Sequence, residues 1–386
     1  MFFFSQKNKE ETIAVFDIGS GSVGGAIFLS SPDKRPIIIS SFRKSFKLRD
    51  FVSGESLIKE MLESVEEVAR YMQKDIHKTP DKVFAVLSSP WATASLRSIK
   101  RKRPEGFTFT EKFTKELIKE EILKFKKENT DFDEIIDRRV VNILLNGYEI
   151  PKPYGKRVKE SEIQILLSLS SGELVNKIEN VITKTYHKEI KFTSQMFSDF
   201  IVVRDIFDRL NDFIILNIDE ETTEVSIMRN DFLVGTASFA YGKNSLIRRI
   251  SKRLNKDISN TASILSMYKN QHLDEGYIKE LEESIKEESK AWTNSLKTVF
   301  RSLFSDLLIP HNIFLVSDTS SDKWFLNLLH KNNFPEFTTT NDSFNVIISD
   351  SKTLHDFYDI ALNVKEDQSL TMQSIFIANV ERGKRK

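Results

Sequence analysis

The residues best suited to chemistry form a short segment near the N-terminus, Phe16-Asp17-Ile18-Gly19-Ser20-Gly21-Ser22-Val23. Residues 12–18 and 23–29 are rich in β-branched and aromatic types, which predicts a β-hairpin with a tight turn. In a turn made of glycine and serine, backbone N–H groups and hydroxyls can approach phosphate oxygens closely. The segment thus predicts a phosphate-binding hairpin, and an ordinary Gly-Ser turn is the alternative.

A second hairpin is expected about 200 residues further along the chain. Residues 213–218 and 225–229 are predicted strands, and the turn between them runs from Asp219 to Thr223. Two such hairpins in one chain indicate duplicated halves that face each other.

The elements that must position these hairpins follow from the hydrophobic pattern. In the first part we expect a strand over 36–46, a helix over 54–78 and a strand over 83–88. Residues 89–190 are expected to form a small α+β unit, with strands over 94–102, 140–145 and 161–168 and helices over 114–128 and 172–187. After the second hairpin we expect helices over 245–254, 259–305, 322–331 and 368–380, and a buried strand over 313–316.

The composition excludes several classes of protein. Of the 386 residues, 40% are hydrophobic and 29% are charged, which allows a large core. The 57 Lys and Arg balance 56 Asp and Glu, so charge gives no reason to expect nucleic-acid binding. The lack of cysteine excludes disulfides, and the six histidines have no zinc-ligand spacing. Without a bilayer-length apolar run or a signal-peptide core, a cytoplasmic protein is expected.

Five features, taken in order along nearly the whole chain, resemble the actin, sugar-kinase and heat-shock chaperone superfamily. They are the Asp17 to Val23 hairpin, the small unit inserted near residue 90, the hairpin over 216–227, the segment Ala240-Tyr241-Gly242-Lys243-Asn244, and the strand over 313–316 followed by Ser317-Asp318. The place of the inserted unit is similar to that in the bacterial FtsA and PilM proteins and differs from that in actin.

The resemblance implies an α/β fold of the actin-like (ribonuclease H-like) kind, with two lobes. A small α+β domain of the SHS2 type would be inserted in the first lobe. Lobe I would begin with residues 1–88, the inserted domain would span 89–190, the chain would return to lobe I over 191–211, and lobe II would span 212–386.

The resemblance also implies a site for ATP and Mg²⁺ between the lobes. Asp17 would hold Mg²⁺ through water, since a hard oxygen ligand suits that ion. The β- and γ-phosphates would be contacted by Gly19, Ser20, Gly21 and Ser22. The second hairpin and the third element of the site would contribute Asn217, Thr222, Thr223 and Gly242.

The second hairpin departs from the family pattern of an acid and several glycines before a Thr-Thr pair. Anchoring on Thr222-Thr223-Glu224 places Asn217 at the acidic position and Asp219-Glu220-Glu221 where glycines belong. A rival alignment keeps Asp219 as the acid and shortens the loop by two residues. Three carboxylates would repel a polyphosphate, because like charges a few Å apart cost on the order of kcal/mol even at an effective dielectric of about 20.

A second departure lies in the adenine-side loop, where Ser317-Asp318 stands in place of paired glycines. Glycines there would let the base and ribose lie against the backbone. The two departures together predict weak or absent ATP binding, that is, a pseudo-ATPase. No residue is assigned a catalytic role.

The functional hypothesis is an FtsA-like actin-fold scaffold or adapter in bacterial cell division or in a membrane-associated assembly. Two alternatives stay open. One is an active ATP-binding actin-like protein that polymerises, and the other is a PilM-like adapter of type IV pilus assembly. The implied partners are proteins, either further copies of the chain or the division or pilus machinery.

Two segments, one apolar and one basic, are candidates for contact with a partner. Phe2, Phe3 and Phe4 precede lysines and would suit contact with a membrane interface at the inner face of the cell membrane or with a partner. Packing on the chain's own lobe or a frayed terminus are the alternatives. The basic run Lys100-Arg101-Lys102-Arg103 suits an acidic partner or a solvated strand end.

Overall fold

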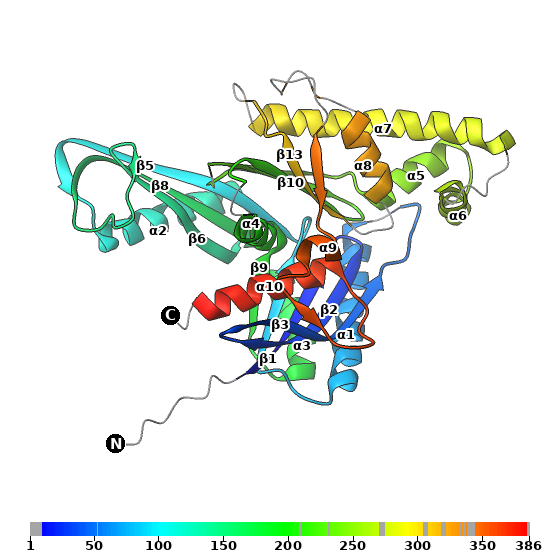
Figure 1. Ribbon diagram of the computed structural model, residues 1–386, viewed down its shortest axis with the longest axis horizontal. Coiled ribbons are helices and arrows are strands. Elements are labelled where there is room, and N and C mark those ends of the chain that lie inside the picture. Colours follow the sequence, from blue (N-terminus) through cyan, green and yellow to red (C-terminus); the bar gives the residue numbers. More distant parts are fainter. Residues whose placement is uncertain are drawn as a thin grey trace.

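A computed structural model describes residues 10–51, 53–207, 210–230, 232–269, 275–303, 308–317, 322–331, 334, 337 and 344–383 of the chain (Figure 1). Two lobes, each built on its own β-sheet, lie one above the other in this view, and a smaller third sheet extends to one side. This architecture confirms the predicted α/β fold class.

Lobe I is built on a sheet with the strand order β15-β3-β2-β1-β4-β9. β1 and β2 form the first predicted hairpin, in which Asp17 pairs with Gly24 and Ile18 with Val23. β4 lies parallel to β1, and β9 lies parallel to β4. The strands are β1 (Glu11–Ile18), β2 (Ser22–Ser31), β3 (Lys34–Ser45), β4 (Lys82–Leu87), β9 (Ile190–Ser194) and β15 (Asp359–Ile360).

Lobe II repeats this plan with the strand order β12-β11-β10-β13-β14. β10 and β11 form the second predicted hairpin, β12 continues it antiparallel, and β13 lies parallel to β10 as β4 does to β1. The strands are β10 (Phe213–Ile218), β11 (Thr223–Arg229), β12 (Phe232–Phe239), β13 (Asn312–Ser317) and β14 (Asn345–Ile348). The duplication inferred from the two hairpins therefore extends to whole sheets.

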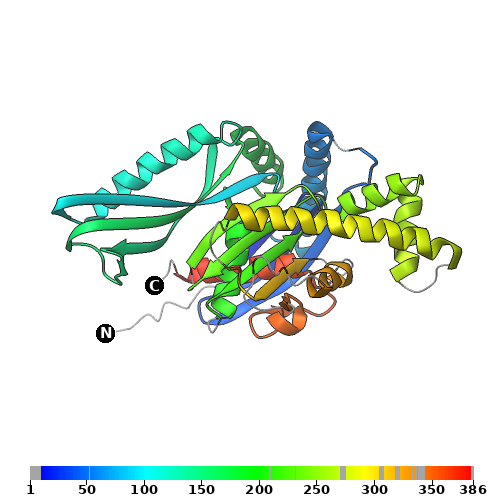
Figure 2. The same cartoon turned by 90° about the horizontal axis from the view of Figure 1, so that it is seen from above.

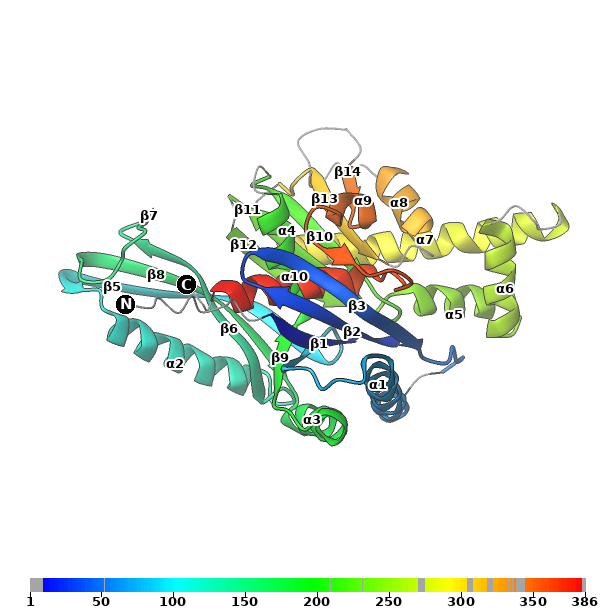
Figure 3. The same cartoon turned by 60° about the horizontal axis from the view of Figure 1, so that its bottom comes forward.

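Helices separate and cover the two sheets. Two of them lie between the sheets, so that Val15 of β1 and Ile215 of β10 belong to one apolar core with Phe200 and Phe376. Two others cover the outer face of the lobe I sheet, and a further pair covers the outer face of the lobe II sheet (Figures 1 and 3). The helices between the sheets are α4 (Gln195–Ile206) and α10 (Gln368–Gly383). The lobe I sheet is covered by α1 (Gly54–Ile76) and α3 (Gly172–Tyr186). The lobe II sheet is covered by α7 (Glu275–Leu303) and α8 (Asp322–Lys331).

The helical end of lobe II is formed by α5 (Lys243–Arg253), α6 (Ile258–Lys269) and one end of α7. They meet on a small apolar cluster centred on Ile250, Leu254 and Leu281. Figure 2 shows α7 crossing the lobe toward α5 and α6. The single helix predicted over 259–305 is thus two helices, α6 and α7. The short helix α9 (Ser351–Leu354) follows β14.

The small inserted unit is a sheet with the order β5-β8-β6-β7, and α2 packs on one face of it. Its core joins Ile99 and Ile163 of the sheet to Leu117 and Phe125 of the helix. The elements are β5 (Ala92–Thr108), α2 (Glu111–Glu128), β6 (Glu134–Leu145), β7 (Tyr148–Glu149) and β8 (Arg157–Ser170).

Helix α3 was expected within the inserted unit, yet it lies beside α1 (Figure 3). Its residues Ile178 and Ile182 share a core with Val65 and Met72 of α1. An amphipathic pattern shows that a helix has a buried face, but it does not say which sheet that face covers. We therefore describe residues 92–170 as the inserted domain and α3 as part of lobe I.

The basic run in β5 is paired with carboxylates of its own domain. Lys100 lies 3.4 Å from Glu162, and Arg101 lies 2.9 Å from Glu120. Lys102 completes the series with Glu160 at 3.6 Å. This pairing favours the solvated strand end over an acidic-partner patch. None of the helices in the described part of the chain is long and apolar enough to cross a membrane.

The packing of the first hairpin on α1 depends on a glycine. A Cβ atom on Gly25 of β2 would lie 2.4 Å from Val68 Cγ1 and 2.6 Å from Met72 Sδ, so Gly25→Ala should destabilise the fold by about 1–3 kcal/mol through overpacking. Chemical denaturation measures the loss. Gly54→Ala is the matched control, because no atom lies within 4 Å of its added Cβ. Equal stability of the two variants would contradict the packing described here.

Candidate functional site

The two hairpins have the same turn and meet between the lobes. In the first turn the Gly19 N–H donates to the Ser22 carbonyl at 2.9 Å, and in the second the Asp219 N–H donates to the Thr222 carbonyl at 3.0 Å. Ile18 pairs with Val23 just as Ile218 pairs with Thr223. This common register supports the alignment in which Asn217 stands at the position of Asp17, and not the shortened loop.

The first hairpin binds a carboxylate of the second. Asp219 Oδ2 accepts the Ser20 N–H at 2.6 Å and the Ser20 hydroxyl at 2.8 Å. It also lies 3.3 Å from the Ser88 hydroxyl, which donates to it. Ser20 itself is fully buried. The Ser20 N–H group, which was predicted to bind a phosphate, thus binds the carboxylate of Asp219 from the other lobe.

The glycines of the site make room for these acidic side chains. A Cβ atom on Gly19 would lie 2.9 Å from Asp219 Oδ2, and one on Gly21 would lie 2.3 Å from Glu220 Cβ. A Cβ atom on Gly242, the residue before α5, would lie 2.3 Å from the Asp219 carbonyl oxygen. The space beside these glycines is therefore filled by Asp219 and Glu220 of the second turn.

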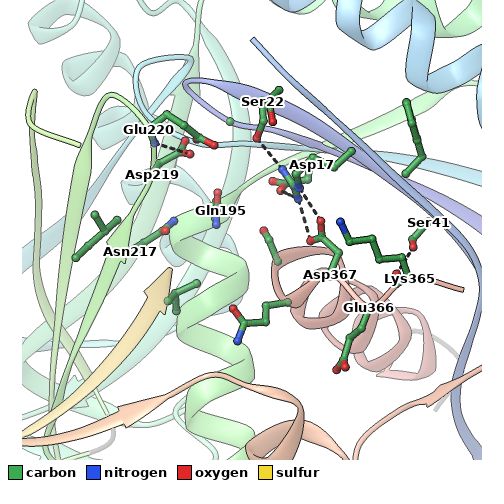
Figure 4. Close-up of a pocket in the computed structure, with 18 of the residues that line it drawn as sticks. Asp17, Ser22, Ser41, Gln195, Asn217, Asp219, Glu220, Lys365, Glu366 and Asp367 are labelled. Carbon is green, nitrogen blue, oxygen red and sulfur yellow. Dashed lines mark hydrogen bonds and ion pairs between the residues drawn. The ribbon is translucent and has the colours of Figure 1, made fainter. Parts of the chain in front are cut away.

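Asp17 is paired with an arginine that sequence reasoning did not single out. Arg43 Nη2 donates to Asp17 Oδ2 at 2.6 Å, and the same guanidinium binds Asp367 and the Ser22 hydroxyl, the latter at 2.9 Å. The amide of Gln373 donates to the other oxygen of Asp17 at 2.6 Å. Figure 4 shows Asp17, Ser22 and Asp367 converging on one point. Both oxygens of the predicted magnesium ligand are therefore engaged.

Arg43 is held in its charged form. Burial alone would lower its pKa, but the carboxylates of Asp367 and Asp17 outweigh burial and raise the pKa well above its ordinary value. A permanent positive charge thus stands beside Asp17 where the family resemblance implies a hydrated metal ion.

The three carboxyl groups of the second turn, which were expected to repel a polyphosphate, are each accommodated in a different way. Burial and the neighbouring Asp219 charge raise the pKa of Glu220 well above its ordinary value, which favours the protonated form of Glu220. Burial opposes ionisation of Asp219 as well, but hydrogen bonds from the Glu220 carboxyl and the Ser20 N–H hold its pKa below the ordinary value. Glu221 forms an ion pair with Arg248 of α5.

The remaining predicted residues lie in or beside the same site. Asn217 is 7% exposed and lines the cavity between the lobes. The Thr222 hydroxyl donates to the Ser89 carbonyl at 3.2 Å, and the fully buried Thr223 hydroxyl donates to the Tyr241 carbonyl at 2.7 Å. Both threonines therefore hold the hairpin in place.

A cavity of about 570 Å³ remains between the lobes. The N-terminal residues of three helices face it, namely Gln195 of α4, Lys243 of α5 and Gln368 of α10. Helix N-termini favour negative charge. Other residues that line the cavity are Asp17, Gly19, Ser22, Ser41, Phe42, Arg43, Ser45, Tyr71, Ile218, Asp219, Glu220, Val316, Lys365, Glu366, Asp367 and Ser369.

The connection from lobe I to the inserted domain is bonded to both hairpins. The Trp91 indole N–H donates to the Gly19 carbonyl at 2.7 Å, and the Ser89 N–H donates to Glu224 Oε1 at 3.0 Å. Burial raises the pKa of Glu224 to about 7, with an opposing contribution from the Ser89 N–H. Burial and the charges of Glu224 and Asp17 likewise raise the pKa of Asp199 well above its ordinary value.

A second, smaller cavity of about 120 Å³ lies where this connection, α4 and lobe II meet. We call it the root cavity. It is lined by Leu87, Ala92, Thr93, Ala94, Ser194, Met196, Glu224, Thr236, Ala237 and Ser238.

Two expectations fall outside the described residues, the membrane contact of Phe2, Phe3 and Phe4 and the loop that follows Ser317. Within the described residues, no group of three or more His, Asp or Glu side chains could hold a metal ion. The arrangement as it stands does not fit ATP with Mg²⁺ in the way that the resemblance implies, because Ser20 is bonded to Asp219 and Asp17 to Arg43.

Comparison with solved structures identifies the architecture. The chain superposes on the structure of a PilM-PilN type IV pilus biogenesis complex with a TM-score of 0.64, at 13% identity, covering 96% of this chain and 98% of that one. The chain has the actin-like ATPase fold.

Two other solved structures match the chain more weakly. The ethanolamine utilization protein EutJ from Carboxydothermus hydrogenoformans matches with a TM-score of 0.44 at 9% identity, over 96% of this chain and 89% of that one. A Bacteroides thetaiotaomicron protein with an actin-like ATPase fold and unknown function matches at 0.40 and 10% identity, over 98% and 99%. No family model matches the chain, and no curated protein matches its sequence.

Replacing Glu224 should change how stability depends on pH. Its pKa of about 7 in the folded protein exceeds the ordinary 4.5, so the folded state loses stability as pH rises from 4.5 to 7. Glu224→Gln removes this loss and still accepts the Ser89 N–H. The variant should gain about 3 kcal/mol relative to wild type between pH 4.5 and 7, and no more above pH 7. Denaturant titrations across this range measure it, and a pH-independent difference would contradict the assignment.

Removing Arg43 should destabilise the protein strongly. Arg43→Ala removes the cation beside Asp17 and Asp367 from a largely buried site, which should cost about 3 kcal/mol. The matched control is Arg35→Ala on the same strand, since Arg35 and its partner Asp359 are about half exposed and 3.8 Å apart. That change should cost less than about 1 kcal/mol. Similar losses in denaturant titrations of the two variants would refute the central role of Arg43.

Proposed function

We propose that the protein is a non-catalytic adapter with an actin-like fold, in which the protein's own side chains occupy the phosphate and magnesium positions of the nucleotide cleft. The observation that carries the proposal is the hydrogen bond from the Ser20 N–H to the Asp219 carboxylate at 2.6 Å. Asp219 takes the place of a phosphate oxygen at the first hairpin. A ligand with phosphate groups would have to displace this carboxylate and then reach a fully buried amide.

The arginine at Asp17 supports the same conclusion. Magnesium-dependent nucleotide binding would need Asp17 to leave both Arg43 and Gln373. Charge-assisted hydrogen bonds of this kind contribute about 1.5–3 kcal/mol each. The alternative of an active, polymerising ATP-binding protein therefore requires two built contacts to be undone before the ligand binds.

The adapter part of the proposal is supported by the likeness to the PilM-PilN complex, in which an actin-like protein is found with a second protein. Between the two versions considered, this likeness favours a PilM-like adapter over an FtsA-like scaffold of cell division. The inserted domain is the proposed contact region, because the Trp91 segment connects it directly to both hairpins. We place the adapter in the cytoplasm at the inner face of the membrane.

The nucleotide part of the proposal can be tested by calorimetric titration with ATP and Mg²⁺. The wild-type chain should show no saturable binding with a Kd below about 0.1 mM. The Arg43→Ala/Asp219→Ala variant, which vacates both positions, is the comparison, provided that circular dichroism shows it folded. Tight binding by wild type that Asp17→Ala abolishes would sink the proposal.

A further inference from the structure

The root cavity opens between two sheet edges. β5 is an edge strand of the inserted domain and β12 is an edge strand of lobe II. They are joined where the Thr236 hydroxyl donates to the Ala94 carbonyl at 3.0 Å. Thr93 is half-buried and Ser238 is exposed, so the mouth of the cavity lies at these two edges. An extended segment of a partner could therefore reach it.

The lining of the root cavity combines apolar walls with a single ionisable group. Leu87 and Met196 are buried and supply apolar surface, while Glu224 is 7% exposed. One oxygen of Glu224, Oε1, accepts the Ser89 N–H. The other, Oε2, has no hydrogen-bond partner of ordinary geometry, although the amide of Asn217, opposite it in the sheet, favours the charged form.

The buried carboxyl groups of Glu224 and Asp199 have no cationic partner in the described part of the chain. Asp199, 2% exposed, is a second buried carboxyl group whose Oδ2 has no hydrogen-bond partner, and burial together with the charge of Glu224 raises the pKa of Asp199. Neither group forms an ion pair with a lysine or arginine of the described part of the chain. Burying a carboxylate without a partner is costly, so a cation delivered from outside would be favoured here.

We propose that the root cavity receives the side chain of one lysine from the partner, with the ammonium on Glu224 and the methylene chain along the apolar walls. The proposal rests on the adapter function, since it specifies what the partner presents. Lysine suits the cavity better than arginine. A guanidinium binds a carboxylate best through both oxygens, and Oε1 is committed to Ser89.

Binding of the lysine should depend on pH. Burial raises the pKa of Glu224 to about 7, and the ammonium binds the ionised form, so affinity should rise between pH 6 and pH 8. The other groups that act on Glu224 are the Ser89 N–H, Asp219 from the second turn and the neutral Asn217, and Glu224 in turn raises the pKa of Asp199 of α4.

The test uses a phage-displayed library of random heptapeptides, selected at pH 8 on the immobilised full chain. Enriched peptides should share one lysine, and replacing it by norleucine in a synthetic peptide should weaken binding at least tenfold. Glu224→Gln should weaken binding of the lysine peptide by the same factor. Glu366→Gln is the matched control, because Glu366 lines the other cavity, and it should leave the affinity unchanged.

Three outcomes would overturn the proposal: a selection without binders, enriched peptides without a basic residue, or equal binding by wild type and Glu224→Gln. The variant keeps the acceptor for Ser89, and a denaturation curve confirms that it is folded. The adapter function is judged separately. Peptides without lysine that bind the inserted domain would leave it standing, whereas tight ATP binding would remove it whatever the peptides show.

Discussion

The structure depends on one hydrogen-bonded contact between lobes, from Ser20 of the first hairpin to Asp219 of the second. It joins residues 199 positions apart in the sequence and lies at the centre of the duplicated architecture. Gly19 and Gly21 leave room for the acidic side chains that this contact brings in. Ser88 adds a third donor to the same oxygen, so the contact also fixes the start of the inserted domain.

Charge in the cleft follows from this contact. Helix N-termini of α4, α5 and α10 face the interlobe cavity and favour negative charge, which the chain provides as carboxylates. Arg43 balances two of these carboxylates, the raised pKa of Glu220 favours its neutral form, and Glu221 is paired with Arg248. Helix N-termini that could bind a polyphosphate here face carboxylates of the chain itself. This substitution is why the likeness in fold is compatible with the proposed loss of nucleotide binding.

The sequence predicted what is local and missed what depends on distant contacts. Both hairpins follow from strand pattern and turn residues, and their equal register follows from equal spacing. The roles of Asp219 and Arg43 could not be foreseen. In the sequence, Asp219-Glu220-Glu221 is only a run of like charges, because the groups that bind them come from elsewhere. Arg43 is one of several cations on a strand with no motif around it. Helix α3 was predicted as an element but placed in the wrong unit, because its pattern does not identify its neighbour.

The helices α4 and α10, which share one core with both sheets, have a mechanical consequence. Two lobes that rotate against each other need a hinge, a place where few contacts are lost on opening. Here the core is continuous through Val15, Phe376 and Ile215 on one side, and hydrogen bonds join the hairpins on the other. Rotation of one lobe against the other would disrupt this core and break these hydrogen bonds at the same time. The body of the molecule is therefore a stiff support from which the inserted domain extends.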